Sequence, residues 1–383
     1  MSDAELRILI TAGAEKQSLA AVRSLGAAGA TVHVLDSKPD APAFRSRYCA
    51  EHFIAPSNRD PHATVEFLLE RVQRHPYTTI LACDDLSATA LSESRARFGP
   101  HTQLLLPGVE AFRLATDKRA LVQFAATRDI PVPQTHIPTD ASDVDAMARD
   151  LGFPVIVKGG HGWGAQHVRL VREPAELRSR FDEVAALEAQ AGGGLPMLQE
   201  FITGTGYGFS TLFRHGEARA VFMHRRAVEF DVQGGGTPYS CPMAESVDDP
   251  VLRDLGMRLF AALGWHGLGM AEWRRDARTG RYVLMEINPR LAGSTDLAVR
   301  AGVNLPLLAC RMARDGDVDP VLQHPGGVQV RWWLPDGFRD LLARPRRIFE
   351  AATWSTPSDW TWRDPAPHWR QLRLVAWQLR HGR

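Results

Sequence analysis

The segment LMEINPRLAGS, residues 284–294, places Glu286, Asn288 and Arg290 at alternate positions. Alternate side chains of a β-strand point to the same face, so an acid, an amide and a cation would lie side by side. The segment GMAEWRRD and the turn ARTG come just before it, and they predict a hairpin that brings Glu272 beside Glu286 within one residue of register. Only one of the two parities places both carboxylates on one face. Two acids and an amide are oxygen ligands that suit Mg²⁺, whereas a solvated strand edge with a Glu–Arg pair is the alternative interpretation.

A glycine-rich segment, GGHGWG at residues 159–164, follows Lys158 between two strand-like segments. Its backbone N–H groups can wrap an anion without obstruction by side chains. No GK[ST] pair follows, which disfavours a P-loop enzyme, and no HRD or DFG segment of a protein kinase occurs downstream. Together with Lys118 and the acid pair, this segment provides the cations, metal ligands and glycine loop that phosphoryl transfer needs. His161 and His167 are candidate acid–base groups, although histidines that pack or hydrogen-bond are commoner.

The first third of the chain alternates strand and helix patterns. RILITAG, ATVHVLD and TTILACDD are apolar and strand-like, and helical segments separate them. This βαβ rhythm predicts a doubly wound parallel sheet over residues 1–112. Ligands of such sheets bind at the carboxyl ends of strands, which makes Thr11–Gly13, Asp36 and Asp84–Asp85 candidates. TAGAEKQS lacks the GxGxxG glycines, so a dinucleotide site is disfavoured, and turns that only close the scaffold are the alternative.

The middle of the chain has a different order of predicted helices and strands. The helical segments TDKRALVQFAATRDI and ASDVDAMARDLG are expected to end at the prolines of PVPQ and at Gly152. Two strand-like segments at residues 207–228 precede a second glycine-rich stretch, VQGGGTPYS at residues 232–240. Arg225 and Arg226 stand just before it and could orient a substrate carboxylate bidentately beneath a lid. The alternative is a surface hairpin loop with solvated arginines.

The last 53 residues contain seven of the ten tryptophans, and ten arginines against five acids. We expect residues 321–383 to form a Trp/Arg-rich C-terminal extension, whose end, APHWRQLRLVAWQLRHGR, has the pattern of a basic amphipathic helix. One interpretation is weak contact with a membrane surface or a partner. The other is a tail that packs its Trp and Leu side chains on the body of the protein while arginine stems extend outward.

Composition restricts the class of protein. The net charge of +1 gives no case for a nucleic-acid partner. The four cysteines are far apart and form neither a metal-binding nor a disulfide pattern, which favours a reducing compartment. The N-terminus lacks the pattern of a signal peptide, and no apolar run approaches the roughly 20 residues of a membrane span. We therefore expect a soluble, cytoplasmic protein without a transmembrane segment.

The order of these segments resembles that of the ATP-grasp family, and in particular the branch with biotin carboxylase, carbamoyl phosphate synthetase and related carboxylate–amine ligases. The matching segments are, in order, TDK with Lys118, PVIVK with Lys158, GGHGWG, LQEFI with Glu200, GMAEW with Glu272, and EINPR. The resemblance implies an α/β (α+β) ATP-grasp fold at residues 113–320, after the N-terminal doubly wound domain. Its lid subdomain would span about residues 125–198, its nucleotide hinge 199–203 and its metal-site sheet 204–320.

The resemblance also assigns roles by position. The phosphates of ATP would be contacted by Lys118 and Lys158 and covered by the loop that contains Gly160, Gly162 and Gly164. The adenine edge would be held by Glu200, Phe201 and Ile202. Mg²⁺ or Mn²⁺ would be bound by Glu272, Glu286 and Asn288. The catalytic set would comprise Arg290, Arg225 and Lys158, with Arg290 steadying the phosphoryl group. Many relatives carry an acid where GTGYG has Gly206, so the residue that holds the ribose stays open.

The implied activity is that of an ATP-dependent, ADP-forming ligase. It would activate a small carboxylic acid, such as an amino acid, as an acyl phosphate and couple it to an amine. One alternative is a bicarbonate-activating, carboxylase-like enzyme, which would need a separate biotin carrier. The other is a nucleotide-binding module without turnover, against which the intact acid pair argues. The expected partners are small-molecule substrates, and the resemblance is compatible with a homodimer.

Overall fold

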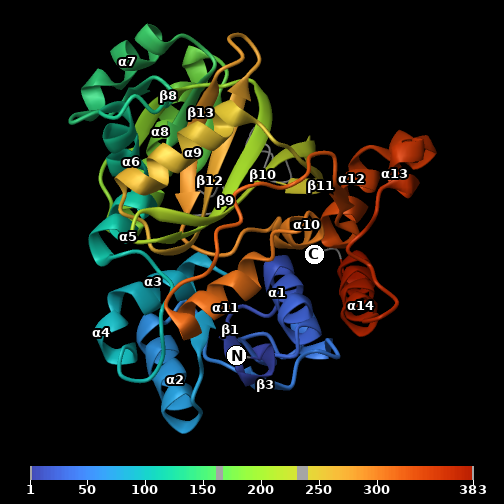
Figure 1. Ribbon diagram of the computed structural model, residues 1–383. Coiled ribbons are helices and arrows are strands. Elements are labelled where there is room, and N and C mark those ends of the chain that lie inside the picture. Colours follow the sequence, from blue (N-terminus) through green and yellow to red (C-terminus); the bar gives the residue numbers. More distant parts are fainter. Residues whose placement is uncertain (1, 161–166, 231–239, 382–383) are drawn as a thin grey trace.

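The chain folds around three β-sheets, described in a computed structural model for residues 2–160, 167–230 and 240–381 (Figure 1). The N-terminal part forms the lower body of the view, and the other two sheets form the upper body. The C-terminal segment lies along one side, and its last helix lies beside the N-terminal part (Figure 1).

The N-terminal domain contains a parallel four-stranded sheet in the order β3-β2-β1-β4, as the βαβ rhythm predicts. Its elements are β1 (Arg7–Ile10), α1 (Lys16–Ala27), β2 (Thr31–Asp36), β3 (Glu51–Ile54), α2 (Pro61–Arg74), β4 (Thr79–Leu81), α3 (Asp85–Glu93) and α4 (Arg95–Phe98). The strands β1, β2 and β4 are buried on both faces, which explains their continuous apolar runs. β3 was not expected from the sequence, because this edge strand is largely exposed and lacks such a run.

A small antiparallel sheet in the order β5-β8-β6-β7 follows the linking helices. The elements of this region are α5 (Val109–Thr116), α6 (Lys118–Ala126), β5 (Thr135–His136), α7 (Val144–Leu151), β6 (Val155–Lys158), β7 (Val168–Val171), α8 (Pro174–Gln190) and β8 (Met197–Glu200). Helix α7 ends at Gly152, as expected, with a φ of 75°. Helix α6, however, already ends at Ala126, because the chain turns through Asp129 at a φ of 53° before it reaches the prolines.

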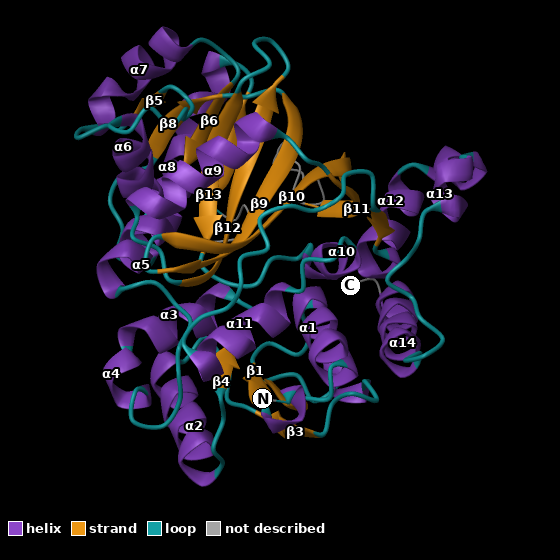
Figure 2. Ribbon diagram, in the orientation of Figure 1, coloured by secondary structure: helices purple, strands orange, loops and turns teal. Residues whose placement is uncertain are grey.

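The large sheet is antiparallel, in the order β13-β12-β9-β10-β11-β14. Its elements and the helices near it are β9 (Gly204–Arg214), β10 (Glu217–Phe230), β11 (Ser240–Ser246), α9 (Pro250–Ala262), β12 (Gly267–Asp276), β13 (Tyr282–Asn288), α10 (Thr295–Arg300), α11 (Leu305–Asp315) and β14 (Gln329–Arg331). On one face, Phe209 and Phe213 pack on Phe260 of α9. On the other face, Phe222 belongs to a core shared with α1 and α11, which joins the large sheet to the N-terminal domain (Figure 2).

The C-terminal segment contains α12 (Phe338–Ala343), α13 (Ala351–Ser355) and α14 (Ala366–His381), of which α14 packs on Pro42–Arg45 of the N-terminal domain. The carboxylate of Asp364 accepts hydrogen bonds from Arg23 Nε, Ser46 Oγ and Arg47 N, each at 2.8 Å. These polar contacts attach the segment to the N-terminal domain, whereas the packing expected of its Trp side chains is found for Trp332 but not for Trp354 and Trp362. Contact of the tail with a membrane or a partner stays a prediction.

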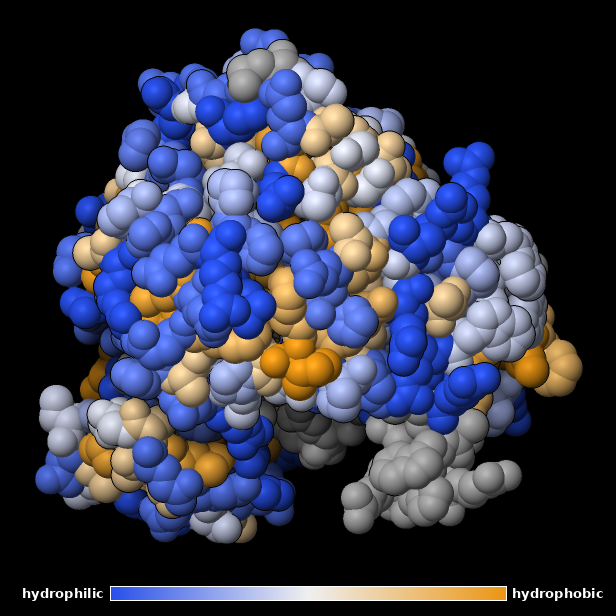
Figure 3. All heavy atoms as spheres, turned by 90° about the horizontal axis from the view of Figure 1, so that it is seen from below, coloured by the Kyte–Doolittle hydropathy of each residue, from blue (hydrophilic) through white to orange (hydrophobic). Residues whose placement is uncertain are grey.

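Some large apolar side chains of this segment remain exposed, among them Phe349, Trp354 and Trp362. Elsewhere, on the face seen from below, hydrophobic residues form separate groups among hydrophilic ones (Figure 3). Within the described part of the chain, no helix combines the length and the apolar character needed to cross a bilayer.

Candidate active site

A cavity of about 750 Å³ lies where the three sheets and the C-terminal segment meet. It is lined by the end of β4 and the start of α1 and α3 from the N-terminal domain, and by β6 and β8 from the small sheet. The large sheet supplies β10, β12 and β13, and the C-terminal segment supplies Trp332, Asp336 and Arg339. Residues separated by more than 300 positions therefore face one space.

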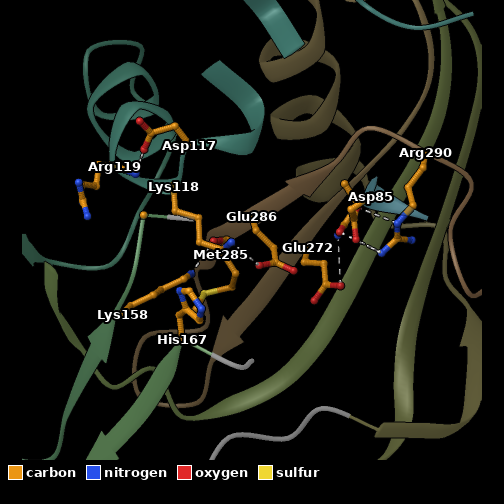
Figure 4. Close-up of polar contacts among 12 residues, drawn as sticks. Asp85, Asp117, Lys118, Arg119, Lys158, His167, Glu272, Met285, Glu286 and Arg290 are labelled. Atoms are coloured by element: carbon orange, nitrogen blue, oxygen red, sulfur yellow. Dashed lines mark hydrogen bonds and ion pairs between the residues drawn. The ribbon is translucent and has the colours of Figure 1, made fainter. Parts of the chain in front are cut away.

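Glu272 and Glu286 are direct cross-strand partners on β12 and β13, so the parity that places both carboxylates on one face is the one found. Their side chains lie next to each other (Figure 4). Both line the cavity together with Asn288, whose side-chain nitrogen lies 3.5 Å from Glu272 Oε1. The register shifts just beyond this pair, because Trp273 faces Leu284 and Met285 has no cross-strand partner. This bulge lies next to the acid pair, as bulges often do at functional sites.

Each carboxylate of the pair has its own neighbouring cation. Arg226 Nη2 donates to Glu272 Oε2 at 2.6 Å, and Lys118 Nζ lies 4.0 Å from Glu286 Oε2. Burial raises the pKa of Glu272; the charge of Arg226 opposes this rise and that of Glu286 adds to it. Burial also acts to raise the pKa of Glu286, but the cations Lys118 and Lys158 outweigh it and lower that pKa. Glu286 is therefore the more firmly ionised member of the pair.

Lys158, the last residue of β6, is only 6% exposed. Its Nζ donates to the carbonyl oxygen of Met285 at 3.0 Å, so the bulge of β13 anchors it beside the acid pair (Figure 4). Burial lowers the pKa of Lys158 to about 8, with Lys118 adding to the effect and Glu286 opposing it. An anion that enters the cavity would restore the preference of Lys158 for its charged form.

Arg290 lies beyond the end of β13 and reaches the N-terminal domain. Its Nε and Nη2 donate to the two carboxylate oxygens of Asp85 at 2.8 and 3.2 Å, and Nη2 also donates to Asn288 Oδ1 at 3.3 Å. Asp84 caps α3 by accepting from Ser87 N at 2.7 Å. The strand-end acids Asp84–Asp85 therefore belong to the same cavity as the motif EINPR, and Arg290 joins the two domains there.

The expected hinge residues Glu200, Phe201 and Ile202 all line the cavity. The carboxylate of Glu200 accepts from Gln134 N at 3.1 Å and from Arg278 Nη2 at 3.2 Å, which fixes its position at the end of β8.

The position of Gly206 is filled from the neighbouring strand. A Cβ atom on Gly206 would stand 2.4 Å from Oε1 of Glu229, which lines the cavity. Arg274 Nη2 donates to the other carboxylate oxygen of Glu229 at 3.3 Å. Glu229 therefore places a carboxylate beside Gly206, where the resemblance led us to expect an acid.

The two adjacent arginines of β10 face opposite sides. Arg226 lines the cavity, whereas Arg225 pairs with Glu245 at 2.8 Å and does not line it. Arg225 therefore does not lie where we expected it. Successive side chains of a strand alternate between its two faces, and here the face toward the cavity carries Arg226. The lid expected at residues 232–240 lies outside the described residues except for Ser240.

Glu188, at the end of α8, was not singled out from the sequence. Its buried carboxylate accepts from Gly160 N at 2.9 Å and Arg119 Nη2 at 3.1 Å, and lies 2.6 Å from His167 Nδ1. It thereby holds Gly160 of the glycine-rich segment together with His167, which follows that segment, and gives His167 a positioning role. The spacing of α8 contains the signal, since Glu188 continues the core positions Leu177, Phe181 and Val184. Gly162, Gly164 and His161 lie outside the described residues.

Residues 115–294 match the family model described as the ATP-grasp domain. The match contains both cavity lysines Lys118 and Lys158, the acid pair and Arg290. Residues 115–294 are an ATP-grasp domain. The preceding parallel sheet and the antiparallel sheets agree with the fold expected from the resemblance.

Two curated proteins are similar to about half of the chain. The chain is 26% identical over 193 residues to the biotin carboxylase of Pseudomonas aeruginosa, a match that covers 48% of this chain and 42% of the carboxylase. It is 27% identical over 195 residues to a D-alanine–D-alanine ligase of Ectopseudomonas mendocina, which covers 49% of this chain and 59% of the ligase. The chain thus spans less than two thirds of the length of these relatives.

Solved structures share the fold over most of the chain. A biotin carboxylase from Campylobacter jejuni, in complex with β,γ-ATP, has a TM-score of 0.67 at 17% identity and covers 83% of this chain and 72% of its own. An N5-carboxyaminoimidazole synthetase from Staphylococcus aureus has a TM-score of 0.63 at 16% identity, with 83% of this chain and 79% of its own covered. The similarity therefore includes the N-terminal domain as well as the ATP-grasp domain.

Proposed function

We propose that this protein is an ATP-dependent, ADP-forming ligase that activates a small carboxylic acid as an acyl phosphate and couples it to an amine. The observation that carries the proposal is the paired geometry of Glu272 and Glu286 on one cavity wall, with two lysines on one side and Arg226 on the other. The similarity to a D-alanine–D-alanine ligase and to biotin carboxylase supports the reaction class.

The residues of the acid pair fit a magnesium ion. The side chains of Glu272 and Glu286 keep 24% and 31% of their surface accessible, and Asn288 adds an amide oxygen. Among the described residues, no group of three or more His, Cys, Asp or Glu side chains could hold a metal by itself. Two acids and an amide leave the remaining positions to water and phosphate oxygens, which is the arrangement that Mg²⁺ favours. When bound, Mg²⁺ would neutralise charge on the transferring phosphoryl group.

The other residues bind and orient the substrates. Lys118 and Lys158 would neutralise the phosphates of ATP, and the hinge at Glu200, Phe201 and Ile202 would hold the adenine edge. Glu229 takes the role that stayed open at Gly206 and would hold the ribose. Arg290, fixed by Asp85, would steady the phosphoryl group, and Arg226 would take the role expected of Arg225 toward the substrate carboxylate.

The chemistry needs an activated acid because oxide is a poor leaving group. An oxygen of the substrate carboxylate would attack the γ-phosphorus, and ADP would leave. The amine would then attack the acyl carbon, lose a proton and expel inorganic phosphate. Acyl phosphates hydrolyse readily, so the enclosure of the cavity by several elements would protect the intermediate from water. We also propose that the protein is cytoplasmic and that it forms a homodimer.

A matrix of carboxylic acids against amines tests the proposal, with ADP release and the mass of the product as readouts. We expect one combination to give ADP and an amide, and hydroxylamine to trap the acyl phosphate as a hydroxamate. The similarity to biotin carboxylase favours bicarbonate as a second candidate substrate, and ADP release that needs bicarbonate but no added acid would replace the first proposal. Nucleotide binding without ADP release in any combination would favour a module without turnover.

A further inference from the structure

The chain uses lysine sparingly. It has 45 basic residues, of which four are lysines, namely Lys16, Lys38, Lys118 and Lys158. Three of these four line the cavity, whereas Lys38 is exposed and lies outside it. Arginine makes most of the ion pairs that hold the fold. A lysine ammonium is a compact and adjustable charge, so its concentration in the cavity indicates that ligands require it there. The proposed nucleotide site uses Lys118 and Lys158, but it gives no role to Lys16.

Lys16 begins α1 and lies where the C-terminal segment closes the cavity. Its Nζ stands 4.4 Å from the ring centroid of Trp332 and 3.7 Å from Asp336 Oδ2. Gly293 leaves room for this side chain, because a Cβ atom there would stand 2.9 Å from Lys16 Cε. Within the described residues, Lys16 Nζ donates no hydrogen bond, and 30% of the side chain stays accessible. The ammonium is thus held in place while its three donors stay available to a ligand.

Lys16 and the nucleotide lysines come from different walls of the cavity. Lys16 belongs to the N-terminal domain and lies against Gly293 and Trp332. Lys158 belongs to the small sheet and donates to Met285, and Lys118 lies near Glu286. Lys16 therefore faces the part of the cavity next to the C-terminal segment, where the acid and the amine would bind if the proposed function is right.

We propose that Lys16 binds a carboxylate that is not phosphorylated in the reaction, with Trp332 and Leu334 as the apolar wall beside it. The inference rests on the proposed function and names the substrate class, which is a dicarboxylic acid on the donor side or an amino acid on the acceptor side. A single ammonium that Asp336 already partly offsets suits a singly charged carboxylate better than a phosphate. The adjacent aromatic and aliphatic surface suits a short carbon chain.

Differential acetylation of the four lysines, read by mass spectrometry on the whole protein, tests this assignment. The probes are dicarboxylates of three to six carbons and the protein amino acids, each with Mg-ATP present. If a dicarboxylate protects Lys16 from acetylation, the extra carboxylate belongs to the donor acid. If an amino acid protects Lys16 and the matching amino amide does not, the carboxylate belongs to the acceptor amine. Unchanged labelling of Lys16 with every probe overturns the inference. Lys38 is the internal control.

The same experiment separates the two proposals. Mg-ATP alone should protect Lys118 and Lys158, and failure to do so would count against the proposed function whatever Lys16 does. Protection of these two lysines without any protection of Lys16 would remove only the present inference.

A pair of variants separates ligand binding from a purely structural contact. If Lys16 binds the carboxylate, Lys16→Met should weaken the protecting compound about tenfold or more and leave ATP affinity unchanged. Asp336→Asn, which removes the partner but keeps the ammonium, should leave that affinity the same or improve it. Equal losses of melting temperature in both variants, with unchanged affinity for the compound, would mean that Lys16 only joins α1 to the C-terminal segment. Lys38→Met serves as the matched control.

Discussion

The lowered pKa of Lys158, about 8, predicts how pH changes nucleotide binding. The ATP-free protein loses the proton of Lys158 as the pH rises through this value, whereas the phosphates of ATP hold the ammonium charged. The affinity for ATP is therefore highest at pH values well below 8 and falls as the pH rises through 8. At pH 9 only about a tenth of the protein carries the charge, so binding should weaken about tenfold, or about 1.4 kcal/mol, from pH 7 to pH 9.

The contribution of Lys158 to the stability of the ATP-free protein should change in the opposite direction. An unfolded lysine titrates near 10.5, so between pH 8 and 10.5 Lys158 binds more protons in the unfolded state than in the folded state. Its contribution to the free energy of unfolding therefore rises with pH across this window, by up to about 3 kcal/mol. The buried thiols act in the other direction, because burial raises the pKa of Cys83 to about 12 and that of Cys241 to about 11, so the folded state keeps thiol protons that the unfolded state loses. The difference between the parent and Lys158→Met therefore isolates the contribution of Lys158.

Calorimetric titration of ATP at pH 7.5, 8.5 and 9.5, in buffers of different ionisation enthalpy, measures both the affinity and the proton uptake. We expect uptake of close to one proton at the upper end. Lys158→Met should bind ATP weakly at every pH, take up no proton, and lose the part of the pH dependence of stability that comes from Lys158, whereas Lys38→Met should behave as the parent. An affinity that does not change between pH 7.5 and 9.5, or the same slope in Lys158→Met, would refute the assignment of Lys158 to the phosphates.

Three further substitutions test the charges of the cavity. Glu286→Gln should lower ADP release at least about a thousandfold and keep the melting temperature, because it removes metal-binding charge from a partly accessible site; near-normal ADP release would contradict the metal assignment. Arg226→Met should lower turnover at least about a hundredfold, whereas Arg225→Met, at the adjacent position, should change it by no more than about threefold in the same assay. Equal effects of the two substitutions would contradict the assignment of Arg226, and not Arg225, to the cavity. Glu188→Gln should cost about 3–5 kcal/mol in local stability of the small sheet by hydrogen exchange and weaken ATP, since it breaks a buried charge cluster; unchanged exchange would argue that the cluster is not a tether.

Much of the fold follows from local patterns in the sequence. The apolar strands of the parallel sheet, the stop at Gly152 and the hairpin of β12 and β13 depend on residues close together in the chain, so periodicity and turn residues predict them. The parity of Glu272 and Glu286 does not follow in this way, because it depends on the bulge at Met285. A shift of one residue would turn one carboxylate to the other face.

The choice between Arg225 and Arg226 has the same origin. Both arginines have identical chemistry, and their neighbours in the sequence do not tell which face of β10 meets the cavity. That face is set by pairing with β9 and β11, and the pairing contains register shifts on both sides. Sequence reasoning can therefore find an arginine pair near the substrate end, but the contact with Glu272 decides which one belongs to the site.

The contacts that sequence reasoning missed join residues far apart in the chain. Glu188 holds Gly160, Arg226 holds Glu272, and Asp364 binds Arg23 from the opposite end of the chain. A buried charge is costly unless a partner of opposite charge or a set of hydrogen bonds compensates it. An acid at a core-facing helix position, as in α8, therefore predicts that such a partner exists, although not which one. Arg226 and Glu272 both line the cavity, so the contact that makes the burial of Glu272 tolerable also positions a residue proposed to bind the metal.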